Sequence, residues 1–192
     1  MREKSILSME NKSMKANDIV AIDVGHARCT GASGNGLQEH EVCVRLAELV
    51  RQELAVHGVE ARVVDFPELS NAADLSATVR EVNGMGAALC VSLHCDASDN
   101  AGAKGAHVIY TSKTGGMVAE QVAKHLCALM PGRANKTVKR GNLYVLNNTR
   151  CPAVLCECGF ITNREDAYMQ KHGLGTIALA IATGVREAMV KL

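Results

Sequence analysis

Residues 87–93, AALCVSL, form an almost wholly apolar run that ends at His94. A run of this kind is typical of a strand that is covered on both faces, as in a parallel sheet. Residues 19–24, IVAIDV, form a second β-rich run, and Gly25 and His26 follow it directly. Each of these two strands is therefore predicted to bring a histidine to the place where the strand ends.

Strands and helices are predicted to alternate along the rest of the chain. Apolar residues at helical spacing predict a helix over 37–57, which Gly58 is suited to end. Further strands are expected at 60–66, 105–110, 143–146 and 153–157, and further helices from Ser70 or Asn71 to about Asn83, at 115–130 and at 174–192. This alternation predicts a single-domain α/β fold, in which an open, mostly parallel, twisted sheet carries helices on both faces.

The composition narrows the class of function. A chain of 192 residues fits one domain that is large enough to bury a core without disulfides. The formal net charge of +1 argues against a nucleic-acid partner. The chain has no Trp and only 3% aromatic residues, whereas sugar-binding clefts usually stack aromatic rings on the pyranose. These features favour chemistry on a peptide-like bond over a glycosidase or a carbohydrate-binding module.

The N-terminal residues 1–17 are polar and charged, and they lack the apolar stretch of a signal peptide. No run is long enough to span a membrane, so we expect no membrane insertion. We expect 1–17 to be a flexible segment and 18–192 to be the folded catalytic domain. The eight cysteines form no CxxC pair and several lie in apolar runs, which predicts reduced, mostly buried thiols rather than a disulfide framework.

Three groups capable of chemistry fall at the ends of predicted strands: His26, His94 and Glu157. Ligands of open α/β sheets bind outside the carboxyl ends of the strands. Glu39, near the start of the predicted 37–57 helix, adds a carboxylate. Taken singly, each histidine has a structural explanation, and Glu39 is a first-turn acid favoured by the helix dipole. Together, two imidazoles and one carboxylate form a known catalytic zinc set with water in the fourth position.

A site of this kind also needs a general base, and Glu157 is the candidate. It lies within residues 155–159, LCECG, an apolar strand end where a charge is costly to bury. An apolar setting raises the pKa of a carboxyl group toward the range that is useful for proton transfer. The alternative is a carboxylate that is paired with a nearby Lys or Arg.

Four segments of the chain resemble the zinc-dependent N-acetylmuramoyl-L-alanine amidases. These segments are IDVGH at 22–26, GLQE at 36–39, SLHCDA at 92–97 and PAVLCECGFITN at 152–163, in the order that the family has them. The last segment is the most specific, because members of the family look like PavLvExGFxxN there. The similarity runs from about Ile19 to Leu192.

The resemblance implies that His26, Glu39 and His94 hold one zinc ion per chain and that Glu157 is the catalytic acid and base. It also implies the substrate, which is the peptidoglycan amide between the lactyl group of N-acetylmuramic acid and L-alanine of the stem peptide. Asp96 departs from the family, where Asn is usual, and this change is expected to affect a hydrogen bond to substrate or around the site rather than metal binding.

Three other residues compete for the role of ligand. Glu41 lies two residues from Glu39, and on a helix the two side chains point about 200° apart, so only one can serve. The Gly-Leu-x-Glu context favours Glu39. His40 and His107 are weaker competitors, and packing within a strand is the simpler account of His107.

The short region between His94 and Glu157 leaves no room for an autoinhibitory helical insert, and the chain resembles the catalytic domains of phage or prophage endolysins. Such a protein is made in the cytoplasm and acts at the cell wall, or lies in the periplasm or outside the cell if a signal was removed. Lys139 and Arg140 are candidates to bind a carboxylate of the stem peptide, with a plain surface role as the alternative.

Three rival interpretations remain open at this point. The chain could be another zinc hydrolase on a similar sheet, such as a carboxypeptidase or deacetylase, since the ligand set is shared. It could be a non-catalytic peptidoglycan-binding module that retains a vestigial site. Finally, Cys151, Cys156 and Cys158 could form a structural metal site, although Cys156 and Cys158 would share a strand face opposite Glu157, and buried packing explains them more simply. The sequence leaves the oligomeric state undefined.

Overall fold

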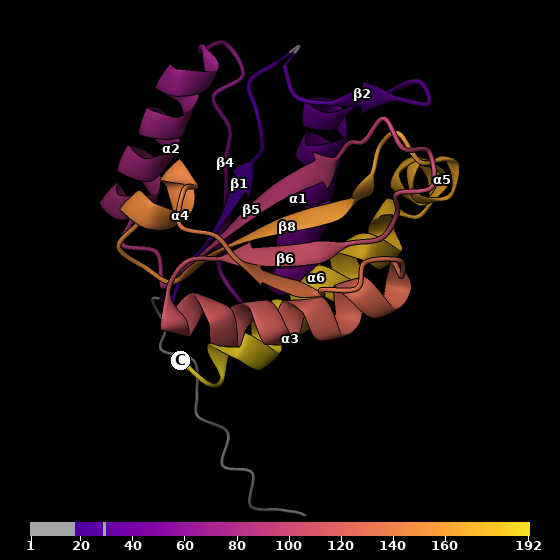
Figure 1. The fold of residues 1–192 in the computed structure, drawn as a ribbon. Coiled ribbons are helices and arrows are strands. Elements are labelled where there is room, and N and C mark those ends of the chain that lie inside the picture. The colour runs from indigo at the N-terminus through magenta and orange to yellow at the C-terminus, as the bar shows by residue number, and fades with distance from the viewer. Residues whose placement is uncertain (1–17, 29) are drawn as a thin grey trace, which may run out of the picture.

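The computed structural model describes residues 18–28 and 30–192, so the expected flexible segment 1–17 and Cys29 lie outside the described residues. Figure 1 shows a central sheet with helices on either side. Six strands form this sheet in the order β4-β1-β5-β8-β6-β7. Their bounds are Ala61–Val64 for β4, Val20–Val24 for β1, Leu89–Asp96 for β5, Ala153–Phe160 for β8, His107–Tyr110 for β6 and Thr137–Lys139 for β7.

The sheet is mostly parallel, as the alternating pattern predicts. Strands β4, β1, β5 and β8 run in one direction. Strand β6 pairs antiparallel with β8, and β7 then pairs parallel with β6. The amino ends of β6 and β7 therefore lie at the edge of the sheet where the other four strands have their carboxyl ends.

Helices cover both faces of the sheet, which confirms the predicted α/β architecture. Helices α1 (Glu39–Val56), α3 (Lys113–Leu129) and α6 (Leu174–Met189) share the larger apolar core with one face. Helices α2 (Asn71–Gly84) and α4 (Tyr144–Asn148) share a smaller apolar cluster with the other face. Figure 1 shows α2 and α4 side by side, across the sheet from α3 and α6.

Most predicted elements appear within a few residues of their expected bounds, but the expected strand at 143–146 is wrong. This segment is the start of α4, a short helix that buries Val145 and Leu146. Four residues with apolar positions fit one turn of helix as well as a short strand, so the local pattern did not distinguish them. Three further elements were not predicted: β7, the helix α5 (Arg164–His172), and a small hairpin of β2 (Ser33–Gly34) and β3 (Leu37–Gln38).

The strand alternation places polar residues on the face that α2 and α4 cover only in part. Ala21 and Cys90 belong to the smaller cluster on this face, and Asp23 and His94 follow them at even spacing along β1 and β5. Because side chains two residues apart lie on one face of a strand, Asp23, His94 and Glu157 all project to the same side. The apolar residues near the amino ends pack under the helices, and the polar ones lie toward the carboxyl ends.

The cysteines that the structure describes are free thiols, as expected from their spacing. Seven are described, and all but Cys151 are buried. Within the described part of the chain, no helix has the length and hydropathy needed to cross a membrane.

Candidate metal centre and catalytic carboxylate

Side chains from three separate elements converge at the carboxyl edge of the sheet. His26 follows β1, Glu39 is the first residue of α1, and His94 lies in β5. One ligand atom from each residue lies within 4.8 Å of the others, and this is the only such group found among the described residues. The sequence predicted these residues at the ends of strands and near the start of a helix, and the fold brings them together.

Glu39 is the centre of the group. Its Oε2 atom lies 3.3 Å from Nε2 of His26, and its Oε1 atom lies 3.1 Å from Nδ1 of His94. The same two oxygens accept backbone N–H groups, Oε2 from Ala32 at 2.7 Å and Oε1 from Cys95 at 2.9 Å. Burial opposes ionisation of Glu39, but the hydrogen bonds from His26 and His94 hold its pKa well below the ordinary value, so the carboxylate is ionised.

The competition between Glu39 and Glu41 is resolved by burial. Glu39 is 2% exposed, while Glu41 faces solvent on the other side of the helix. His40 is also buried, but it turns to Asp65, whose Oδ1 lies 3.1 Å from its Nε2, and it is not part of the ligand group.

The backbone around His26 is shaped to hold the two imidazoles together. His26 has a φ of 65°, a left-handed conformation that is uncommon for a residue with a side chain. The ring of His26 meets the ring of His94 edge-on, with centroids 5.0 Å apart. A Cβ atom on Gly25 would lie 2.5 Å from Cε1 of His94, so only glycine leaves room for this imidazole. Non-glycine residues in such a conformation persist where the surrounding structure fixes them, which is frequent at ligand sites.

The donor set fits a zinc ion. Two imidazole nitrogens and one carboxylate oxygen are ligands that zinc accepts in a tetrahedron with one position left for water. Burial opposes protonation of His94, whereas the hydrogen bond with Glu39 and the charge of Glu157 raise the pKa of His94. An environment that favours positive charge on the imidazole is also one that favours a bound cation.

Glu157 lies next to the ligand group, on the adjacent strand. It is in register with His94 in the pairing of β5 with β8. Its Oε2 atom is buried and has no hydrogen-bond partner among the residues that the structure describes. Burial raises the pKa of Glu157 to about 7; the charge of His94 lowers it, and those of Asp96 and Glu39 raise it further.

The paired-carboxylate interpretation of Glu157 finds no support in the contacts. Among the described residues, no Lys or Arg lies within ion-pair distance of Glu157. A carboxyl group with a buried oxygen and no ion-pair partner, beside a possible metal centre, is the arrangement expected of a general acid and base.

The three candidate substrate contacts have different positions. Asp96 is half-buried at the end of β5, and its Oδ2 lies 3.5 Å from the guanidinium of Arg133. Arg140 is exposed and follows Val138 by two residues; because Val138 packs on the smaller cluster, Arg140 lies on the face of the sheet that carries Glu157. The charge of Arg140 lowers the pKa of Glu157. Lys139 pairs in register with Tyr110, whose side chain packs on the larger core, and therefore lies on the opposite face of the sheet. The structure brings Arg140 and Asp96 toward Glu157 but not Lys139.

The sequence did not point to Arg133, and it offered His107 only as a weak competitor for the metal; His107 is not part of the ligand group. His107 is 1% exposed and is in register with Glu157 across β6 and β8. Its Nε2 lies 3.2 Å from the guanidinium of Arg133. Burial, together with the charges of Arg133 and Arg140, lowers the pKa of His107 to about 4, so this imidazole is neutral. The antiparallel direction of β6 puts His107 here, and the sequence carried no signal for that direction.

The proposed cysteine metal site has no counterpart in the described residues. Cys156 and Cys158 are fully buried in the larger core, on the face of β8 opposite Glu157, and Cys151 packs on the smaller cluster. Packing accounts for all three thiols.

The family model and the relatives that match this chain belong to one kind of protein. A model of the N-acetylmuramoyl-L-alanine amidase family matches residues 20–187. The amidase LytC of Bacillus subtilis is 31% identical over 85% of this chain, which spans 33% of LytC. The endolysin of Bacillus phage SPP1 is 30% identical over 89% of this chain and 66% of its own length. The chain thus spans about a third of the first of these relatives.

Solved structures that resemble this chain are of the same kind. The amidase AmiC2 of Nostoc punctiforme is 29% identical with a TM-score of 0.78, covering 89% of this chain and 96% of that one. The catalytic domain of the CD27L endolysin, which targets Clostridia difficile, is 30% identical with a TM-score of 0.81, covering 88% of this chain and 97% of that one. With a family model that matches most of its length, the chain belongs to the N-acetylmuramoyl-L-alanine amidase family.

Proposed function

We propose that this chain hydrolyses the peptidoglycan amide between N-acetylmuramic acid and L-alanine in a zinc-dependent reaction. The observation that carries the proposal is the convergence of His26, Glu39 and His94 beside the unpartnered carboxyl group of Glu157. Membership of the amidase family supports the choice of bond. The region that forms the catalytic domain would be 18–192. The relatives named as cell wall amidases or as an endolysin support action at the cell wall, which would follow synthesis in the cytoplasm.

In this proposal, His26, Glu39 and His94 hold one zinc ion. The ion supplies a Lewis acid for the carbonyl and lowers the pKa of water to about 7 when it is bound. Glu157 accepts the proton of the attacking water and later donates it to the nitrogen of the leaving alanine. Its raised pKa suits both steps, because the group can be ionised before attack and protonated afterwards near neutral pH.

The hydrogen bonds of Glu39 fix the geometry of the site before any metal binds. The N–H groups of Ala32 and Cys95 orient the carboxylate toward both imidazoles. Partners that orient a ligand in this way tune metal affinity. Asp96 and Arg140 would contact substrate from the far side of Glu157.

The test is digestion of purified peptidoglycan by the enzyme as prepared, after chelation, and after zinc is added back. The expected products, identified by mass, are stem peptides that begin with a free L-alanine, lost on chelation and restored by zinc. Release of other fragments would favour the rival carboxypeptidase or deacetylase. Binding to the wall without any release would favour the non-catalytic module.

A further inference from the structure

A second pocket lies beside the site, toward β6 and β7. It has a volume of about 470 Å³ and is bounded by the 102–104 loop, the 132–135 loop, Val138, Arg140 and Phe160. Three of its lining side chains are cations, those of Lys104, Arg133 and Arg140, and no carboxylate is among the described residues that line it. A concave surface with several cations and no acid attracts anions.

The three cations differ in how far their charge is already neutralised. The ammonium of Lys104 lies 2.7 Å from a carboxylate oxygen of Glu165. The guanidinium of Arg133 lies 3.5 Å from Asp96 and 5.2 Å from the ring centroid of Phe160. Within the part of the chain that the structure describes, no acid lies within ion-pair distance of Arg140. Arg140 is therefore the cation that remains available to an anion from outside.

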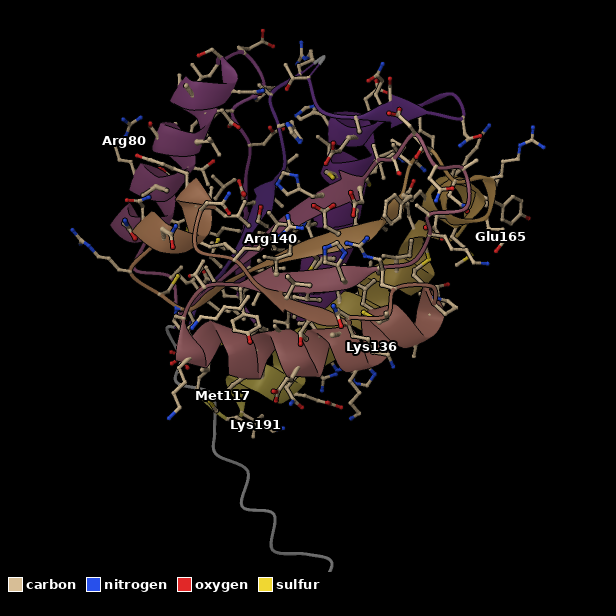
Figure 2. All side chains as sticks on the ribbon, in the orientation of Figure 1. Arg80, Met117, Lys136, Arg140, Glu165 and Lys191 are labelled. Atoms are coloured by element: carbon tan, nitrogen blue, oxygen red, sulfur yellow. The ribbon has the colours of Figure 1, made fainter. Side chains whose placement is uncertain are left out.

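Arg140 also connects the pocket to the catalytic carboxyl group. It follows β7, where Val138 packs on the same face of the sheet as Glu157. Side chains at 138 and 140 share a face, and the charge of Arg140 acts on both Glu157 and His107. In Figure 2, Arg140 lies over the central strands, whereas Lys136 lies beside α3.

The walls of the pocket are fixed by close backbone contact. A Cβ atom on Gly105 would lie 2.7 Å from the backbone nitrogen of Gly132, and a Cβ atom on Gly132 would lie 2.6 Å from the carbonyl oxygen of Lys104. The N–H of Ala106 donates to the carbonyl of Met130 at 2.8 Å. The two loops are thus held together, which reduces the ordering that binding would require.

The strand order gives the direction in which a substrate crosses the site. His26 follows β1, His94 lies in β5, Glu157 lies in β8 and His107 begins β6, and these strands are consecutive in the sheet. The metal ligands and the pocket lie on opposite sides of Glu157 along the sheet. Since Glu157 is proposed to protonate the leaving alanine nitrogen, the peptide is expected to extend over the pocket, and the sugar toward β1.

The pocket on the β1 side has the opposite character. It is a cavity of about 140 Å³ whose lining includes the buried carboxyl groups of Asp23 and Asp74, together with His26 and Leu75. The Oδ1 atom of Asp74 is buried, and no described residue forms a hydrogen bond with it. Acceptors of this kind suit an uncharged group that donates hydrogen bonds, such as a sugar, and they repel a carboxylate.

We propose that the pocket beyond Glu157 binds a carboxylate of the peptide that leaves, and that Arg140 is its principal contact. This inference rests on the proposed function, because it assigns the two ends of that substrate. Arg140 thereby makes the enzyme prefer stem peptides with a free carboxylate over those in which the same group is amidated. A guanidinium matches a carboxylate with two parallel hydrogen bonds, whereas an amide forfeits the charge.

The experiment compares three soluble muropeptides with the zinc-loaded enzyme. One has all carboxylates free, one is amidated at the acidic residue after alanine, and one is amidated at the C-terminal carboxyl. We expect Arg140→Gln to lower kcat/KM for the free form about tenfold or more, mainly through KM. For the amidated form that lacks the carboxylate bound by Arg140, we expect a change of less than about twofold. The form that shows no loss identifies which carboxylate is bound.

The matched control is Lys139→Gln, which removes the same charge from the neighbouring residue on the opposite face of the sheet. It should leave all three substrates unchanged. Equal losses on all substrates for Arg140→Gln, or equal effects of the two variants, would overturn the inference while leaving the amidase activity established.

A binding measurement keeps the inference testable apart from turnover. The free stem peptide, which has no scissile amide, is titrated into the protein, and backbone amide shifts are followed by NMR. Shifts at 102–104 and 132–135 that Arg140→Gln weakens support the pocket even if no muropeptide is cleaved. Absence of such shifts for the wild-type protein, together with no preference among substrates, counts against it.

Discussion

The carboxyl group of Glu157 lies where ionisation is unfavourable, with one oxygen buried and unpartnered. An amide of the same shape removes the titration while keeping the packing. We expect Glu157→Gln to lower kcat on peptidoglycan by about 10²- to 10⁴-fold, because general acid–base catalysis contributes about that much. Zinc content, measured by elemental analysis after gel filtration, should stay at one ion per chain.

His94→Ala provides the contrasting variant, since it removes one of the three proposed ligands. It should lose both activity and zinc. If Glu157→Gln kept full activity, the assigned acid and base would be wrong, whatever the metal content.

The same residue predicts a dependence of stability on pH. Burial raises the pKa of Glu157 from 4.5 to about 7, so the folded protein binds the proton more tightly than the unfolded chain does. The free energy of unfolding should therefore fall as pH rises from about 4.5 to 7, and stay constant with respect to this group above that range. The free energy of unfolding of metal-free Glu157→Gln, relative to that of wild type, should therefore increase by up to about 3 kcal/mol between pH 4 and pH 8.

Urea unfolding of the metal-free proteins at several pH values measures this difference. Asp23, whose pKa burial raises to about 6, titrates in both proteins and so cancels in the comparison. A difference between the two proteins that does not change with pH would show that Glu157 ionises freely in the folded state.

The sequence identified the candidate ligands because each lies next to a recognisable strand or helix end. His26 and His94 follow apolar runs, and the family motifs singled out Glu39. Arg133 gave no such signal, and the sequence favoured simple packing for His107, because the place of both depends on β6 running against β8. Lys139 and Arg140 looked equivalent in the sequence, and only the register of β7 separates their faces.

At the scale of elements, the loop between β1 and α1 determines the geometry of the proposed ligands. Gly31 has a φ of 83°, and a Cβ atom there would lie 2.8 Å from Oε2 of Glu39 and 2.9 Å from Cδ2 of His26. We expect Gly31→Ala to weaken zinc binding roughly tenfold or more, as changes around metal ligands usually do. Competition with a coloured chelator measures the affinity.

Gly36→Ala is the matched control for this variant. Gly36 also has a left-handed backbone, with a φ of 76°, but a Cβ atom there would meet nothing within 4 Å. Both variants carry similar backbone strain, so only the contact with the ligands differs. Equal zinc affinities for the two variants would show that Gly31 matters for the turn alone.

The two errors that concern helices have different causes. Segment 143–146 is helical because Val145 and Leu146 pack on the smaller cluster, and four residues do not define a period. Helix α5 was not predicted, although Asn163 caps it by accepting from the N–H groups of Glu165 and Asp166. That capping signal is present in the sequence, because Asn163 ends the motif at 152–163 and two acidic residues follow it in the first turn.

The larger apolar core and the polar side chains of the candidate site lie on opposite faces of one sheet. Helices α3 and α6 pack against each other within the larger core. A Cβ atom on Gly184 would lie 2.5 Å from the Cα atom of Val122, so the two helices approach closely only because this residue is glycine. We expect Gly184→Ala to lower the free energy of unfolding by about 1 to 3 kcal/mol through overpacking.

Gly175→Ala, in the same helix, is the comparison, because a Cβ atom there meets nothing within 4 Å. It should be neutral or stabilise the protein by up to about 1 kcal/mol through helix propensity. Chemical denaturation measures both. Zinc affinity should be unchanged in each, and a loss in Gly184→Ala would mean that strain passes through the sheet to the site.

The reversed direction of β6 and β7 also determines where the chain can change length. Segments 97–106 and 131–136 both enter the sheet at the edge that carries the candidate metal site, whereas 111–112 and 149–152 turn at the opposite edge. Insertions in the first pair would rebuild the border of the basic pocket, and those in the second pair would lie far from it. Related enzymes could therefore diverge in substrate choice by lengthening two loops, with the metal ligands and their scaffold left intact.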